Sequence, residues 1–143
     1  MANELQRIVC FDFGSKRIGV AMSDPMEIIA QPLCFIEQKP DFINQIEKII
    51  NEYLPHEIVV GYPLNLKGER GQKTIEVDQF IELLEEKFML PIIKWDERFT
   101  TQIATNSMRE LNMSKKNRES RKHIDAMAAA LILQGYLDYR KSK

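Results

Sequence analysis

The sequence does not carry the features that characterise disulfide-rich, zinc-binding, membrane or secreted proteins. Its 143 residues include only two cysteines, Cys10 and Cys34, and two histidines. Two cysteines neither build the disulfide framework of a small secreted domain nor supply the Cys/His spacing of a zinc site. No window approaches the roughly 18 uninterrupted apolar residues of a membrane span, and the first residues, MANELQR, lack the apolar stretch of a signal peptide. We therefore expect a cytoplasmic protein without membrane contact.

The net charge is also small, but the two parts of the chain carry opposite charges. The formal net charge of −1 argues weakly against a nucleic-acid partner. Residues 1–108, however, carry 11 Lys+Arg and 17 Asp+Glu, whereas residues 109–143 carry 9 and 4. The basic side chains are densest at Lys115, Lys116, Arg118, Arg121 and Lys122. They form either a solvated surface or an electrostatic contact for phosphates.

The length, with 44% hydrophobic and 29% charged residues, indicates one globular domain over residues 1–143. The first half predicts strands at 7–14, 18–24 and 28–37 and a helix at 42–53 that Pro55 ends. The short link after the first strand predicts an antiparallel hairpin. Pro32 favours an edge position or a bulge for the third strand.

The second half of the chain alternates between strand and helix patterns. Strands are expected at 57–63 and 92–95, with an apolar helical stripe from Val77 to Phe88 between them. A further helix is expected after Thr100 and Thr101, and a final alanine-rich helix from about residue 124, with Asp125 in its first turn. Strand–helix–strand units favour parallel crossovers. We therefore predict an α/β fold, a mixed five-stranded sheet flanked by helices, with a three-strand antiparallel meander and two parallel strands.

Acidic residues stand where the predicted strands end or the final helix begins. Asp12 is inside an apolar strand, where an unpaired carboxylate is costly. Asp96 and Glu97 follow the last strand, at the edge where open α/β sheets place their sites, and adjacent residues point to opposite faces. Two of these acids also have a simple structural explanation, a turn at Asp12 and helix-dipole complementation at Asp125.

Taken together, three such carboxylates form a set of hard oxygen ligands. This chemistry suits Mg²⁺ or Mn²⁺ and not zinc. Two such ions roughly 4 Å apart activate a water and stabilise the leaving oxygen of a phosphodiester. The pattern therefore favours metal-dependent phosphodiester hydrolysis, provided that the fold brings the carboxylates together.

Four ordered motifs resemble those of the YqgF family, described as pre-16S ribosomal RNA nucleases and also as Holliday junction resolvases. They are FDFGSKRIGVAMSD, VVGYPLNLKGERG, DERFTT and IDAMAAALILQGYL, and the resemblance covers residues 7–137. The resemblance implies a ribonuclease H-like fold, a cytoplasmic bacterial nuclease and a structured RNA or branched DNA as substrate, with possible association with a ribosome precursor. It places the catalytic, metal-binding acids at Asp12, Glu97 and Asp125, with Asp96 the weaker candidate.

The same resemblance suggests nucleic-acid contacts. Lys16 and Arg17, in the turn after the first strand, are candidates to hold the scissile phosphate, and Arg98 either pairs with a motif carboxylate or contacts the backbone. The basic residues from Lys115 to Lys122 become a candidate contact surface. Gly61, Asn65, Gly68 and Gly71 belong to a loop that approaches the nucleic-acid backbone in this interpretation.

Several alternatives remain at this point. A Holliday junction resolvase uses the same chemistry as an RNA-processing nuclease, and a non-catalytic nucleic-acid-binding factor would keep the same fold. Junction resolution usually requires two coordinated sites and favours a dimer, but the sequence shows no clear interface, so a monomer or weak homodimer is expected. An actin-like ATPase resemblance at D-x-G-S-K fails because 143 residues cannot supply a second lobe.

Overall fold

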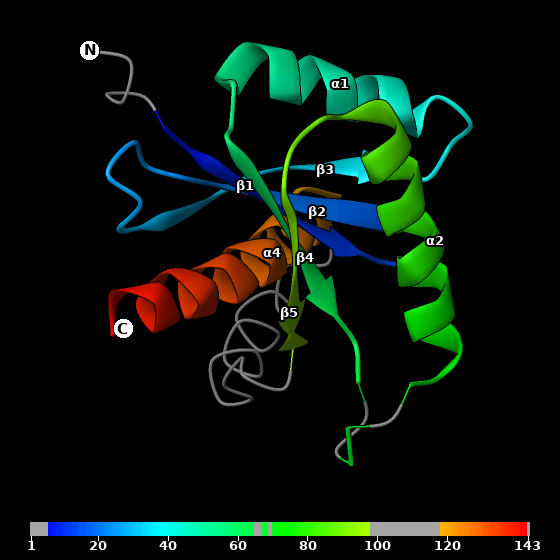
Figure 1. Cartoon of the computed structure of the whole chain (residues 1–143). Helices are drawn as coiled ribbons and strands as arrows, with labels where there is room; N and C mark the ends of the chain where they lie inside the picture. Colours follow the sequence, from blue (N-terminus) through cyan, green and yellow to red (C-terminus); the bar gives the residue numbers. More distant parts are fainter. Residues whose placement is uncertain (1–5, 65–66, 69, 98–117, 143) are drawn as a thin grey trace.

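A mixed five-stranded sheet lies at the centre of the protein (Figure 1). The computed structural model describes residues 6–64, 67–68, 70–97 and 118–142, with the side chains of residues 118–123 outside the description. The strands are β1 Ile8–Phe13, β2 Arg17–Ser23, β3 Ala30–Glu37, β4 Glu57–Tyr62 and β5 Ile92–Asp96. Their order is β3-β2-β1-β4-β5. Antiparallel pairs join β1, β2 and β3, and parallel pairs join β1, β4 and β5. The predicted meander with two parallel strands is confirmed.

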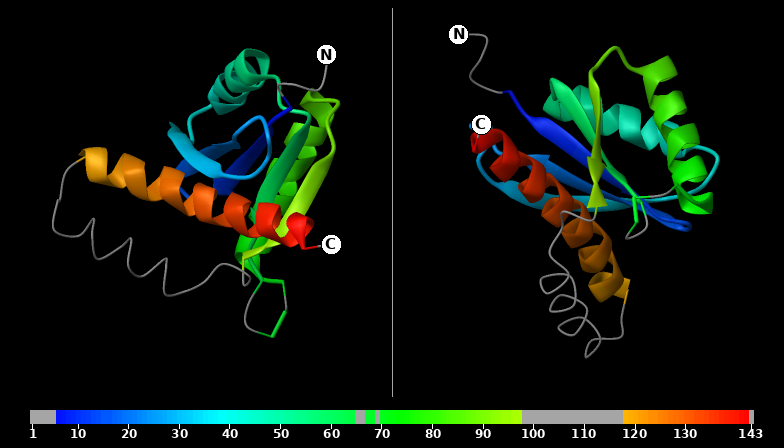
Figure 2. Two further views of the ribbon diagram at one scale, coloured as in Figure 1. Left: turned by 90° about the vertical axis from the view of Figure 1, so that its left-hand side faces the viewer. Right: turned by 60° about the horizontal axis from the view of Figure 1, so that its bottom comes forward.

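The helices cover both faces of this sheet. They are α1 Phe42–Tyr53, α2 Gln72–Lys87 and α4 Arg118–Lys141. Figures 1 and 2 show α1 and α2 on one side and α4 on the other. None of the helices within the described ranges is long and apolar enough to cross a membrane. The helix expected after Thr100 and Thr101 falls in 98–117, outside the described residues.

Alternation along the strands decides which side chains meet which helices. In β1, Val9 and Phe11 pack into the core under α1 and α2, whereas Ile8 and Cys10 pack under α4. Because successive side chains of a strand point to opposite faces, Asp12 belongs to the α4 face. Phe13 belongs to the α1/α2 face, where its ring stacks on that of Phe80, with 4.6 Å between the centroids.

The edge position of β3 follows from Pro32, as predicted. Pro32 lies opposite Ala21, beside a register shift between Val20 and Ala21. Proline has no N–H to donate to a further strand, and it is tolerated at such edges and irregularities. The hairpin between β1 and β2 closes tightly, with the Gly14 N–H donating to the Arg17 carbonyl at 2.9 Å.

Helix α4 packs closely on β2 because small residues face the sheet. Ala129 is fully buried, and a Cβ at Gly19 would lie only 2.0 Å from the Asp125 carbonyl oxygen. The helix begins at Arg118, earlier than predicted. The prediction that Asp125 lies in its first turn was therefore wrong, because residues 118–123 contain no Gly or Pro and continue the helix N-terminally. Asp125 lies about two turns inside α4, too far from the N-terminus to complement the helix dipole. Its backbone packs instead against Gly19.

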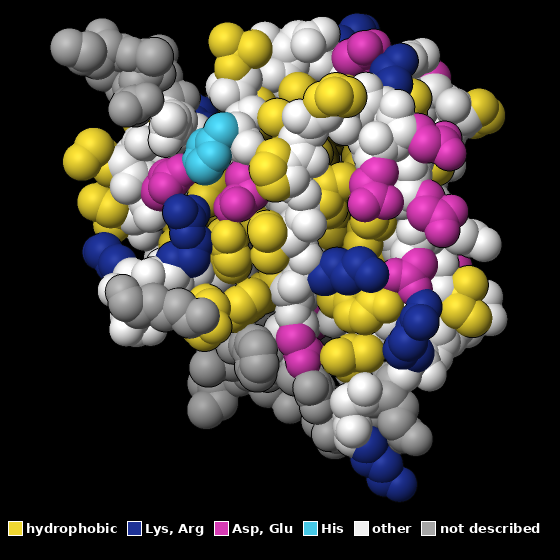
Figure 3. Space-filling model, viewed as in Figure 1, with side chains coloured by type: hydrophobic (Ala, Val, Ile, Leu, Met, Phe, Trp, Pro, Cys, Tyr) yellow, Lys and Arg dark blue, Asp and Glu magenta, His cyan; other side chains and the backbone are white. Residues whose placement is uncertain are grey.

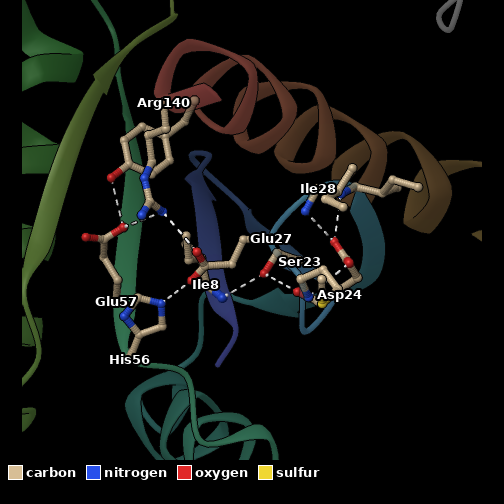
Figure 4. Close-up of polar contacts among 11 residues, drawn as sticks. Ile8, Ser23, Asp24, Glu27, Ile28, His56, Glu57 and Arg140 are labelled. Atoms are coloured by element: carbon tan, nitrogen blue, oxygen red, sulfur yellow. Dashed lines mark hydrogen bonds and ion pairs between the residues drawn. The ribbon is translucent and has the colours of Figure 1, made fainter. Parts of the chain in front are cut away.

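Polar contacts fasten the other end of α4 to the strands (Figure 4). The Arg140 guanidinium lies 3.5 Å from a Glu27 carboxylate oxygen and 3.8 Å from one of Glu57. The Tyr136 hydroxyl donates to Glu57 at 2.8 Å, and His56 also contacts Glu27. These contacts hold the C-terminal end of α4 at the edge where β4 begins, while Asp125 lies toward the opposite end of the helix.

Candidate active site

Two of the predicted acids lie at the edge of the sheet where β1, β4 and β5 end. These strands run parallel, so their carboxyl ends meet at one edge, the usual place for a site in such sheets. Asp12 is the fifth residue of β1 and Glu97 directly follows β5. Cys10, fully buried on the same face, has a pKa raised by burial and by the charges of Asp12 and Glu97. Cys10 and Asp12 of β1 thus share one electrostatic environment with Glu97, which is 85 residues from Asp12 in sequence.

The faces of the sheet distinguish Glu97 from Asp96. Asp96 lies opposite Tyr62 in the β4–β5 register, and it shares the α1/α2 face with Lys94, whose ammonium lies 5.0 Å from the Tyr62 ring centroid. The Glu97 side chain instead passes over Gly61 on the α4 face. A Cβ at Gly61 would lie 3.3 Å from Glu97 Oε2 and 2.8 Å from the Ile132 side chain of α4. Glu97, and not Asp96, is therefore on the same face as Asp12.

Burial and the charges of neighbouring carboxylates raise the pKa of both acids. Burial, followed by the charges of Asp12 and Asp96, raises the pKa of Glu97 to about 7, against a partial lowering by Lys73. Burial also raises the pKa of Asp12, with Lys73 opposing the shift and Asp125 adding to it. A bound cation would stabilise these two carboxylates, whose negative charges lie close together and are largely removed from water. The donor set is therefore suited to a hard divalent cation.

Asp125, the third predicted acid, is held by Arg17. The Arg17 Nε donates to Asp125 Oδ2 at 2.5 Å, with both side chains largely shielded from solvent. Arg17 is the first residue of β2 and not part of the preceding turn, and its guanidinium also lies 5.9 Å from the Phe35 ring centroid. The sequence suggested a phosphate contact for Arg17. The structure shows a structural ion pair that spans 108 residues and that no local pattern indicates.

The three acids are neighbours without forming a ready three-ligand cluster. Within the described part of the chain, no group of three His, Cys, Asp or Glu side chains is close enough to hold one metal ion. The ion pair with Arg17 provides a physical reason, because it directs the Asp125 carboxylate to the guanidinium. Asp12 and Glu97 remain as the pair whose charges are poorly compensated.

Sequence reasoning missed Lys73, which stands in the first turn of α2. Its ammonium is near enough to both Asp12 and Glu97 to lower the pKa of each. A signal existed, since cations are disfavoured at helix N-termini and a lysine there calls for an explanation. Thr74, fully buried beside it, fixes this turn by donating to the Gly71 carbonyl at 2.7 Å.

The other predicted nucleic-acid contacts receive little test from the structure. Lys16 is in the exposed hairpin turn. Outside the described residues lie Arg98, Lys115 and Lys116, and the side chains of Arg118, Arg121 and Lys122 are likewise not described. Gly61 lies under Glu97 and Ile132, a packing role that its predicted approach to nucleic acid did not include.

Three relatives of similar sequence carry the same name. A protein of Caldicellulosiruptor saccharolyticus named "Putative pre-16S rRNA nuclease" is 44% identical over 139 residues, which cover 95% of this chain and 99% of that protein. One of the same name from Ruminiclostridium cellulolyticum is 44% identical over 135 residues, 92% of this chain and 94% of that protein. A third, from Desulfitobacterium hafniense, is 40% identical over 137 residues, 96% of this chain and 95% of that protein.

Solved structures establish the fold. T. thermophilus RuvC in complex with a Holliday junction substrate superposes with a TM-score of 0.56 at 13% identity, covering 95% of this chain and 96% of that one. The Fowlpox virus resolvase in complex with Holliday junction DNA gives 0.51 at 14% identity, covering 96% and 98%. The ribonuclease H-like fold is thereby confirmed. The sequence model of the RuvX family, described as Holliday junction resolvase, matches residues 6–139. The chain belongs to this family, also known as YqgF.

Proposed function

We propose that this protein is a metal-dependent nuclease that hydrolyses a phosphodiester bond in the precursor of 16S ribosomal RNA during ribosome assembly. In this proposal Asp12, Glu97 and Asp125 are the catalytic acids, and the cofactor is Mg²⁺ or Mn²⁺. The substrate is a structured RNA. The relatives with 40–44% identity over nearly the whole chain support this choice of substrate.

The observation that carries the proposal is the convergence of Asp12 and Glu97 on one face of the sheet edge. Asp12 lies in β1 and Glu97 directly follows β5, and both are on the face that α4 covers. Burial raises the pKa of both carboxyl groups, and the charge of Asp12 raises that of Glu97 further. Within the described residues neither carboxylate has an ion-pair partner. A fold that tolerates such a costly arrangement needs a cation to offset it.

Mg²⁺ or Mn²⁺ bound by these acids would supply an activated water and stabilise charge on the leaving oxygen, most effectively as two ions in the two-metal arrangement. The chain's own residues perform the remaining tasks. Glu97, with a pKa of about 7, is poised to exchange a proton near neutral pH when no cation neutralises it. Arg17, which is paired with Asp125, also places a guanidinium at the edge of the sheet where β1 ends. Lys16 adds a cation to the exposed turn beside it.

The alternative substrate is a four-way DNA junction. The description of the family and the likeness to RuvC favour it, and the chemistry would be unchanged. Coordinated cleavage of a junction requires two sites, so this alternative predicts a homodimer on the DNA. The RNA substrate is compatible with a monomer or a weak homodimer, and with association with a ribosome precursor.

The deciding experiment compares two labelled substrates under identical conditions. One is an RNA fragment that spans the precursor 5′ extension and the mature start of 16S ribosomal RNA, and the other is a four-way junction. Each is incubated with the protein in Mg²⁺, in Mn²⁺ and in a chelator. We expect cleavage of the RNA with either metal and none in the chelator.

The variants are Asp12→Asn and, as a matched control, Asp41→Asn. Asp41 precedes α1 and makes no side-chain capping bond, so its loss should leave cleavage intact. Asp12→Asn should abolish cleavage and retain binding. Cleavage that survives Asp12→Asn contradicts the mechanism, and junction-only cleavage transfers the proposal to DNA. Binding of either probe with steep salt dependence and no cleavage would instead identify a non-catalytic binding factor.

A further inference from the structure

The α1/α2 face of the sheet carries a hollow directly behind the candidate active site. It has a volume of about 330 Å³. Its apolar part comes from Phe13, Phe42, Phe80 and Leu83, and its polar groups come from Gln38, Glu76 and Gln79. We refer to this hollow as the base pocket. Phe13 ties it to the site, because Phe13 is the neighbour of Asp12 in β1 and points to the opposite face.

The apolar part of the base pocket is built from aromatic rings. The Phe13 ring stacks on Phe80 with 4.6 Å between centroids and 29° between planes, and the Phe42 ring lies 6.2 Å from that of Phe80. Phe80 is buried, while Phe13 and Phe42 are only partly covered and Leu83 is 44% exposed. A partly exposed aromatic surface of this kind can stack on any of the nucleobases, because each of them is a flat heterocycle.

The polar groups around these rings match the edge of a nucleobase. Carboxamides such as those of Gln38 and Gln79 both donate and accept hydrogen bonds, and Glu76 accepts from an exocyclic amino group. The Gln38 amide already donates to the Gly14 carbonyl in the hairpin turn. This bond connects the pocket wall to the turn between Asp12 and Arg17, so the pocket and the acidic edge share one support.

Lys73 connects the base pocket to the acids. It lies on the same stripe of α2 as Glu76 and Phe80, at positions i, i+3 and i+7. Three other cations of α2, β5 and the loop before α2 are paired with acids, and Figure 3 shows side chains of both charges mixed over α2 and β5. Arg70 and Lys94 contact Asp78, and Lys87 lies 3.6 Å from Glu47. Within the described residues Lys73 has no such ion pair.

We infer that the base pocket and Lys73 form a subsite for one unstacked nucleotide of the substrate, with its base on Phe13 and its phosphate on the Lys73 ammonium. This inference rests on the proposed nuclease function and deepens it. The strand would pass over the end of β1, from the acids on the α4 face to the aromatic rings on the other. Such a path requires a nucleotide that leaves its helix, as the loops and ends of structured RNA allow.

The test is a base-removal scan on whichever of the two probes the unmodified protein cleaves. Single abasic nucleotides are placed in turn on both sides of the cleaved bond. Binding is then measured in the Asp12→Asn background, which prevents cleavage. We expect one position at which loss of the base weakens binding roughly five- to hundredfold. In Phe13→Leu, which keeps an apolar side chain but loses the ring, that penalty should shrink to about twofold or less.

Two matched controls lie at the other end of α2. Phe88→Leu removes a ring from the edge of the same core, and Lys87→Met removes an exposed cation. Both should keep the abasic penalty. Lys73→Met should lower the slope of log affinity against log salt by about one, and Lys73→Arg should restore it. Because Lys73 is exposed, this arm remains informative even if Phe13→Leu folds poorly.

The outcomes separate the subsite from the nuclease function. Cleavage by the unmodified protein with no sensitive abasic position overturns the subsite alone. An abasic penalty of equal size in Phe13→Leu and Phe88→Leu, together with an unchanged salt slope in Lys73→Met, also overturns it. Failure of the unmodified protein to bind or cleave either probe overturns both the function and the subsite.

Discussion

The backbone of Asp125 rests directly on Gly19. A Cβ added at Gly19 would lie 2.0 Å from the Asp125 carbonyl oxygen and 2.7 Å from its carbonyl carbon. Both distances are far below van der Waals contact, and the obstacle is helix backbone, which cannot rotate away as a side chain does. The absence of a side chain at one position of β2 therefore sets how near α4, and with it an acid of the candidate active site, approaches the sheet.

We predict that Gly19→Ala displaces α4 and lowers both stability and activity. Overpacking at a contact with backbone should cost about 3 kcal/mol or more in the free energy of unfolding. Urea denaturation of Gly19→Ala and Gly71→Ala measures this, since a Cβ at Gly71 meets no atom within 4 Å. Gly71→Ala should remain within about 1 kcal/mol of the unmodified protein. Equal stability of the two variants would contradict the packing argument.

A second prediction concerns the adjacent acids Asp96 and Glu97. Glu97→Gln should lower kcat by roughly a hundredfold or more, because it removes a proposed metal ligand. Asp96→Asn should change kcat only a few fold, since Asp96 lies on the opposite face beside Tyr62. Steady-state cleavage with saturating Mg²⁺ compares the two isosteric changes. If Asp96→Asn is the more damaging, the assignment of faces to function is wrong.

The raised pKa of Glu97 predicts that stability depends on pH when no metal is bound. Its pKa is about 7 in the folded protein, against the usual value of 4.5, so the folded state binds more protons between these values. Stability should therefore be greatest below about pH 4.5 as far as Glu97 alone is concerned. It should fall as pH rises through the window to about 7 and level off above it. The shift corresponds to roughly 3 kcal/mol at most.

The measurement is the difference in unfolding free energy between the unmodified protein and Glu97→Gln, in chelator, at several pH values from 4.5 to 8. The unmodified protein should lose stability relative to Glu97→Gln as the pH rises, and saturating Mg²⁺ should recover part of the loss. Taking the difference removes the contributions of other groups, such as Asp24, whose pKa is lowered because three backbone N–H groups donate to it despite the opposing effect of burial. A difference independent of pH would contradict the raised pKa.

Much of the fold could be predicted because local patterns determine it. The period-two and helical patterns located every described strand and helix, and Pro32 identified the edge strand. The start of α4 was placed too late, since a run of charged residues reads as a linker although Arg, Lys and Glu are good helix formers. The acidic excess of residues 1–108 and the basic excess of residues 109–143 could be counted in the sequence. Which acid each Lys or Arg pairs with could not be predicted.

The candidate site could be predicted only in part. Asp12 and the adjacent pair Asp96 and Glu97 were candidates because carboxylates at the ends of apolar strands are conspicuous, and only the family resemblance favoured Glu97 over Asp96. Which of Asp96 and Glu97 faces Asp12 depends on the register of β4 with β5 and on the absence of a side chain at Gly61. The pairing of Arg17 with Asp125 depends on how α4 crosses β2, and the approach of Lys73 depends on where α2 begins. These are tertiary relationships without a local pattern.

Arg17→Met tests whether the ion pair with Asp125 competes with metal. In chelator, loss of the guanidinium leaves Asp125 unpaired near Asp12, and the variant should be less stable by about 1 kcal/mol or more. With the Asp125 carboxylate released, Mg²⁺ should bind several fold more tightly in calorimetry and should restore more stability than in the unmodified protein. Lys39→Met, which removes only an exposed pair with Glu37, is the matched control and should change neither quantity. Weaker Mg²⁺ binding by Arg17→Met would mean that the ion pair holds Asp125 in place for the metal and does not compete with it.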